Sequence, residues 1–116
     1  MILAHADSSK KGWFCGPWNS DLSISLGYAN QGIDEPHVHG QITEIYLVAR
    51  GAAEIRVEQE TIKLRSGDMI VLAPGEAHTF LSSSPDYFHF VLHTPGLAGE
   101  MALREKTPVS RTRLGL

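Results

Sequence analysis

The residues best suited to chemistry are three histidines and one glutamate: His37, His39, Glu44 and His78. Imidazole nitrogens and a carboxylate form a donor set that suits a divalent first-row metal. His37 and His39 are two residues apart, so on a strand both side chains would point to the same face. Such a pair could hold one ion, or it could be a solvated pair with no function. The presence of Glu44 and His78 favours metal binding over a solvated pair.

Glu44 needs a bend in the chain to join the histidines. It lies five residues after the second histidine, so an unbroken strand would place it on the opposite face. Gly40-Gln41 could supply a bend or bulge that brings it back. The carboxylate stands in the apolar run 42–50, where an unpaired charge is costly. Its partner could be a metal ion or an arginine such as Arg50 or Arg56.

Two more residues could act on a substrate. Tyr46 should point inward beside Glu44, where its hydroxyl could bond a substrate or donate a proton. Alternatively, it is a core tyrosine whose hydroxyl is satisfied elsewhere. His89 could be a base or support the site if its strand face points inward. The two faces of that strand carry Tyr87, His89, Val91 and His93, and Phe88, Phe90 and Leu92. The apolar set would normally face the core.

The elements that must position these residues are short strands. We expect strands at 21–28, 42–50, 53–57, around 62–64, and at 69–73, 78–81 and 87–93, separated by turn residues. Only 96–105 could hold a short helix. Many short strands at this spacing predict an all-β, antiparallel sandwich or barrel. Phe80 should share the face of His78 and line the same pocket.

Length and composition fit one ordinary globular domain. The chain has 116 residues, of which 42% are hydrophobic and 20% charged. The net charge of −3 and the lack of a broad basic patch argue against a nucleic-acid partner. Two small basic clusters, at 104–106 and 111–113, are expected to belong to a solvated tail.

The single cysteine, Cys15, excludes an internal disulfide. We expect it to be a small buried residue rather than a reactive thiol. Without a signal-peptide pattern, and with no run near the ~20 apolar residues that span a bilayer, we expect a cytoplasmic protein without a membrane partner. Trp13 and Trp18 could cap a barrel or join a dimer contact, and we expect core packing rather than ligand stacking for them.

The spacing of the histidines and glycines resembles the two motifs of the cupin superfamily. In the first, over about 32–51, Gly32 precedes His37, His39, Glu44 and Gly51, although the spacer after Gly32 is four residues where five is usual. In the second, over about 67–82, Gly67-Asp68 and Gly75-Glu76-Ala77-His78 match. Ala73 stands where a proline is expected, Pro74 follows it, and Ser82 replaces an asparagine. None of these departures affects a metal ligand.

The resemblance implies a cupin-type antiparallel β-barrel, or jelly roll, over residues 1–116. It also implies that His37, His39, Glu44 and His78 bind Mn, Fe, Ni, Cu or Zn, among which the sequence does not choose. The expected function is an enzyme acting on a small oxygen-bearing or anionic molecule by dioxygenase, lyase or decarboxylase, or isomerase chemistry. A non-catalytic small-molecule or sugar-binding protein is the alternative. A homodimer is expected from the resemblance and from exposed sheet edges.

Overall fold

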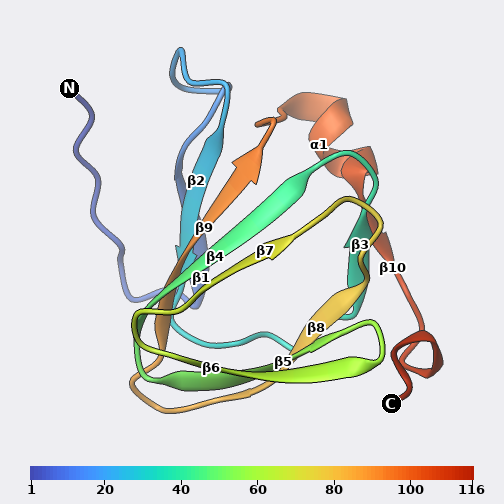
Figure 1. Cartoon of the computed structure of the whole chain (residues 1–116). Coiled ribbons are helices and arrows are strands. Elements are labelled where there is room, and N and C mark those ends of the chain that lie inside the picture. Colours follow the sequence, from blue (N-terminus) through green and yellow to red (C-terminus); the bar gives the residue numbers. More distant parts are fainter.

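The computed structural model describes residues 1–116 as two five-stranded antiparallel sheets that enclose a barrel (Figure 1). The first sheet contains, in spatial order, β1 (Lys11–Cys15), β2 (Ser25–Ala29), β9 (Phe88–Thr94), β4 (Thr43–Arg50) and β7 (Met69–Leu72). The second contains β10 (Lys106–Pro108), β3 (His37–His39), β8 (His78–Ser83), β5 (Ala52–Val57) and β6 (Glu60–Arg65). The helix α1 (Gly99–Glu105) leads directly into β10, and the 3-10 helix η1 (Thr112–Leu114) follows it.

From β2 to β5, and again from β6 to β10, successive strands alternate between the two sheets. Gly51 carries the chain from β4 to β5 at a φ of +74°, and a Cβ at this position would lie 2.4 Å from Ser84 Oγ. Glycine is therefore required here both by its backbone angle and by the close approach of a neighbour. Within the second sheet, β5 and β6 form a hairpin whose turn includes Glu58 at a φ of 48°.

The hydrophobic core lies between the inner faces of the two sheets. Ile55 is fully buried and Leu72 and Phe80 nearly so. On β4 the buried positions are Glu44, Tyr46 and Val48, whereas Leu47 is exposed, as the alternation of the sequence predicts. This inward row connects the candidate site to the core, because Tyr46 and Val48 belong to the core cluster and Glu44 comes next along the strand.

The strand at 87–93 contradicts one prediction. Tyr87, His89 and Val91 are buried, whereas Phe90 is 43% exposed, so the apolar set faces outward. The outward aromatic rings pack against aromatic rings on neighbouring strands: Tyr28 stacks on Phe88 with ring centroids 5.8 Å apart. The aromatic side chains of this strand therefore pack against other rings on the outer face. The face that carries His89 and His93 points into the barrel, toward the site.

The two ends of the chain also differ from the expectations. β1, which contains Trp13 and Cys15, was not predicted as a strand, and Cys15 is buried as expected. The C-terminal segment is not a solvated tail: β10 pairs with β3, and Leu114 is fully buried. Within it, Arg111 forms an ion pair with an aspartate of the β2–β3 loop. No helix is long and apolar enough to span a membrane.

Candidate metal centre

Four histidines from three strands surround Glu44. His37 and His39 lie on β3, His78 on β8 and His93 on β9, and Glu44 lies on β4. His37 and His78 are opposite each other across neighbouring strands. The histidine pair shares a buried face, as predicted.

Glu44 joins the histidines by a different route from the one expected. The loop at 40–42 does not form a bulge within one strand. Instead it carries the chain from β3 in the second sheet to β4 in the first, and the two strands then face each other across the barrel. A side chain that points inward from β4 therefore meets the side chains that point inward from β3.

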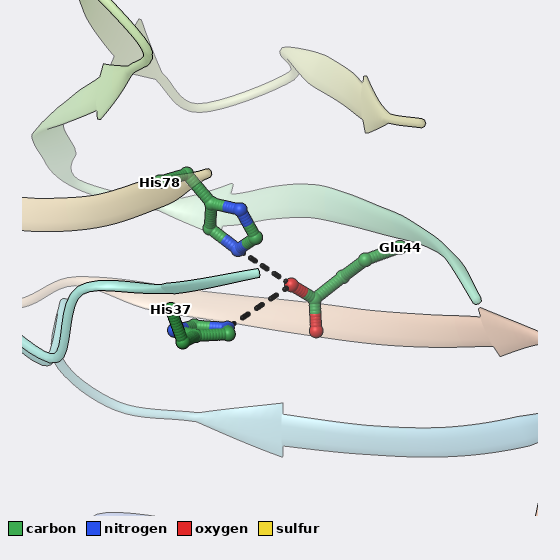
Figure 2. A group of neighbouring side chains, drawn as sticks. All are labelled: His37, Glu44 and His78. Carbon is green, nitrogen blue, oxygen red and sulfur yellow. Dashed lines mark hydrogen bonds and ion pairs between the residues drawn. The ribbon is translucent and has the colours of Figure 1, made fainter. Parts of the chain in front are cut away.

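The carboxylate of Glu44 divides its contacts between two pairs of histidines. Oε1 lies 2.9 Å from His78 Nε2 and 3.9 Å from His37 Nε2. Figure 2 shows the two rings directed at this oxygen. Oε2 lies 3.6 Å from His39 Nε2 and in close contact with His93 Nε2. Each oxygen thus forms, with two histidines, a group whose ligand atoms lie within 4.8 Å of one another.

His93 is the residue that sequence reasoning missed as a candidate ligand. It was placed on one face with His89, but that face was expected to point outward. The two-residue period of a strand could have identified it: because His89 points inward, His93 four residues later must point inward too. Its ring also packs against Trp13, with centroids 4.8 Å apart.

The ring orientations test whether a cation fits here. His37 Nδ1 lies 2.6 Å from the carbonyl oxygen of Glu35, and His78 Nδ1 lies 3.1 Å from that of Glu76. A carbonyl oxygen only accepts, so each Nδ1 donates. Burial, followed by the nearby His78, lowers the pKa of His37 to about 4, and a neutral ring has a single proton. The lone pair of His37 Nε2 therefore faces the carboxylate of Glu44.

His39 gives a second indication of the same kind. Both of its ring nitrogens are buried without a hydrogen-bond partner. Buried polar atoms of this kind are rare in folded proteins and need an explanation such as an ion. A cation beside Glu44 would satisfy both the lone pair of His37 Nε2 and an unpartnered nitrogen of His39. The residues present therefore fit a divalent metal.

The charge of Glu44 is maintained by the histidines. Burial alone would raise the pKa of this carboxyl group, but its contacts with His39, His78 and His93 outweigh burial and keep the pKa well below the ordinary value. No arginine takes part. Arg56 donates to the carbonyl oxygen of Leu114 and to Thr61, and Arg50 lies over the ring of Phe88.

Tyr46 and His89 stand next to the centre, on the side of the core. Tyr46 is buried and its hydroxyl donates to Glu44 Oε1 over 2.8 Å. Burial, with the nearby Glu44, raises the pKa of this hydroxyl well above its ordinary value, so it keeps its proton. The ring of His89 lies 4.6 Å from that of Tyr46, and its Nδ1 is 2.7 Å from the hydroxyl of Tyr87. Burial lowers the pKa of His89 to about 4, so this ring is neutral at pH 7.

Glu105, at the end of α1, supports the centre from behind. Its carboxylate is buried and accepts from the backbone N–H groups of Gln41 and Ile42 over 2.9 and 3.0 Å. One of its oxygens lies 3.6 Å from His39 Nδ1. Glu105 thereby holds the loop that carries the chain from β3 to β4. It also lies beside the Nδ1 side of His39, a candidate metal ligand.

The centre opens into a pocket of about 680 Å³. This volume is in the range of small-molecule sites. Phe80 lines it beside His78, as predicted. Trp13 and Trp18 also line it, and each is nearly half exposed, so the expectation that they pack in the core is wrong. Lys11 and Lys106 stand at its rim.

Comparisons with known proteins agree with this architecture. The family described as AraC-like ligand binding domain matches residues 22–113. A comparison with curated proteins found no match. Among solved structures, KdgF from Halomonas sp. is 22% identical, with a TM-score of 0.63, over 78% of this chain and 85% of that one.

Two further solved structures have the same fold. Pac13 from Streptomyces, called a nucleoside dehydratase and solved with uridine, is 14% identical, with a TM-score of 0.68, over 94% of this chain and 92% of that one. A cupin protein from Bacteroides fragilis is 20% identical, with a TM-score of 0.62, over 84% of this chain and 87% of that one. At these identities the similarity establishes the cupin fold.

Proposed function

We propose that this chain, which belongs to the AraC-like ligand binding domain family, is a metal-dependent enzyme acting on a small organic molecule. The proposed ligands of the metal are His37, His39, Glu44 and His78, with His93 beside them. One observation carries the proposal: the Nε2 atom of His37, which bears a lone pair, lies 3.9 Å from a buried carboxylate oxygen, and a cation held beside both atoms would satisfy them together.

A divalent ion held there would supply Lewis acidity toward an oxygen-bearing substrate, or a meeting point for substrate and dioxygen. One carboxylate beside neutral imidazoles leaves a net charge of +1 on such a centre, which suits an anionic substrate. The reaction classes that fit are dioxygenase, lyase or decarboxylase, and isomerase. Lyase chemistry has additional support, because Pac13, a protein of the same fold, is called a dehydratase.

The protein's own groups would divide the remaining work. Tyr46 retains its proton and donates to Glu44, which suits a group that orients the carboxylate or donates to a substrate oxygen. His89 is neutral and lines the same pocket, so one of its ring nitrogens is free of a proton and would accept one, or a hydrogen bond, from a bound substrate as a weak base. Both roles are part of the proposal.

Oxygen dependence separates the proposed reactions. The protein would be loaded in turn with Fe²⁺, Mn²⁺, Ni²⁺, Cu²⁺ or Zn²⁺ and incubated with small hydroxy, keto and uronic acids, with and without air. Oxygen uptake that requires the metal identifies a dioxygenase, and turnover without air identifies a lyase or isomerase. The variant His78→Ala controls for chemistry outside the site. If every compound that binds is left unchanged with every metal, the proposal that the protein is an enzyme is refuted.

A non-catalytic binding protein is the second candidate. It is favoured by the description of the matching family as a ligand binding domain. In that case the metal would orient a ligand or stabilise the barrel. Calorimetry with the same acids tests this reading, which predicts saturable binding with no product.

We also propose a homodimer. Its support is the outer face of the first sheet, where Leu47, Met69, Val71 and Phe90 are each more than 40% exposed. Apolar side chains gathered on one sheet face are typical of an interaction surface. Light scattering after size exclusion should give twice the chain mass of 12.7 kDa, and the double substitution Met69→Lys and Val71→Lys should give a monomer.

A further inference from the structure

Two tryptophans that line the pocket have exposed apolar surface. Trp13 is 48% exposed and Trp18 47% exposed, and their rings meet edge to face with centroids 6.2 Å apart. The Trp13 ring also lies against His93, so its pocket side stands directly beside the proposed metal centre. Large half-exposed indoles in a concave site provide a surface on which a ring can stack.

A lysine stands on the same face of the same strand. Lys11 precedes Trp13 by two residues on β1, so both side chains point into the pocket, roughly 7 Å apart along the strand. A ring stacked on Trp13 would therefore bring an acidic group on its edge within reach of the long, flexible side chain of Lys11.

The charged residues at the pocket rim leave the Lys11 ammonium group available to bind an anionic group of a ligand. Lys106, on β10, closely contacts one oxygen of Glu35, and Lys11 Nζ lies 3.9 Å from the other. Glu35 is thus engaged by Lys106, while the Lys11 side chain remains 60% exposed. The remaining acidic residues of the pocket, Glu44 and Glu105, are buried and have their own partners.

We propose that the inner face of β1 forms a subsite for a ring-bearing organic acid, with the ring on Trp13 and Trp18 and the anionic group at Lys11. This inference rests on the proposed function and names its substrate class. The ring would lie beside the metal centre, which would receive another oxygen of the same molecule. Aromatic acids and sugar acids share this chemistry.

Matched pairs of probes test the subsite. Benzoate and benzamide differ in charge but share a ring, as do glucuronate and glucose. Each would be titrated into Zn²⁺-loaded protein, with the indole N–H signals followed by NMR. We expect the acid of at least one pair to bind about fivefold more tightly than its neutral partner, as one partly exposed ion pair allows. The pair with the stronger binding distinguishes an aromatic acid from a sugar acid.

Variants assign the effect to the two residues. Lys11→Met should abolish the preference for the acid but keep the binding of the neutral ring. Lys63→Met, which removes an exposed lysine on β6 outside the pocket, should change nothing. Trp13→Ala should lower the affinity for the acid and for its neutral partner alike, about tenfold. Trp13→Phe should restore most of the affinity.

The proposal is overturned if acids and neutral partners bind equally in the wild type, or if the preference survives in Lys11→Met. Metal binding is measured separately for each variant. Normal zinc binding with no preference for acids refutes the subsite and leaves the metal centre intact. Failure of the wild type to bind zinc refutes the metal centre, and the same titrations of the metal-free protein then decide on the subsite.

Discussion

Glu105→Gln should weaken metal binding more than it weakens the fold. Glu105 accepts from the N–H groups of Gln41 and Ile42, and lies 3.6 Å from His39 Nδ1. Glutamine keeps a carbonyl oxygen for the loop but lacks the charge that favours a donating Nδ1 and a basic Nε2 on His39. A carboxylate hydrogen-bonded to a ligating histidine is typically worth 10–100-fold in metal affinity. Glu105 lies 3.6 Å from His39 Nδ1 without a hydrogen bond, so we expect a loss at the lower end of that range, about tenfold or 1.4 kcal/mol.

The stability cost should be smaller for Glu105→Gln and larger for Glu105→Ala. Glutamine replaces a charged acceptor by a neutral one, which costs about 1 kcal/mol. Alanine leaves the buried N–H group of Ile42 and the partly buried N–H group of Gln41 without their partner, and we expect about 3 kcal/mol in the free energy of unfolding. Glu100→Gln is the matched control, because Glu100 lies on the same helix but is exposed and pairs only with Arg104.

Two assays separate these effects. Urea unfolding of the metal-free proteins gives the stability change, and competition with a chromophoric chelator gives the zinc affinity. Zinc binding by Glu105→Gln as tight as that of Glu100→Gln and the wild type would contradict this prediction. Glu105 would then stabilise only the loop and would not support His39.

Three other predictions each concern a single residue. Tyr46→Phe removes the hydroxyl that donates to Glu44 and should destabilise the metal-free protein by about 2 kcal/mol in urea unfolding; no change would show that the bond contributes nothing. The lowered pKa of His89, about 4 against an ordinary 6.5, means that the unfolded chain binds this proton first, so stability should fall as pH drops from about 6.5 to 4, and His89→Gln should flatten that slope in thermal melts. Gly51→Ala places a Cβ 2.4 Å from Ser84 Oγ at a positive φ, and should lower stability by more than ~1 kcal/mol; an unchanged melting temperature would contradict this strain.

The sequence predicted the barrel and most of its strands because alternation, turn residues and the histidine spacing agree. The inward row of Glu44, Tyr46 and Val48 follows from parity alone. The route by which Glu44 reaches the histidines could not be read in this way. The same break at 40–42 is compatible with a bulge within a strand or with a crossing between sheets, and only the pairing of β4 with β7 and β9 distinguishes them.

The orientation of β9 and the position of His93 were missed for one physical reason. The orientation of β9 was assigned from hydrophobicity, but this barrel buries a polar face around the candidate centre and leaves Phe90 outside. His93 was lost with that assignment. The role of Glu105 was equally hidden, because a helix of seven residues far along the chain gives no signal of where it docks. Only tertiary contacts place its carboxylate beside His39.

Elemental analysis of the untagged protein is the sharpest test of the proposed metal centre. Wild type, His78→Ala and His5→Ala would be compared after reconstitution, His5 being an exposed histidine outside the site. We expect about one divalent metal per chain in the wild type and in His5→Ala, and its loss in His78→Ala without unfolding. A wild type that takes up no metal, or a His78→Ala variant that retains full occupancy, would contradict this expectation.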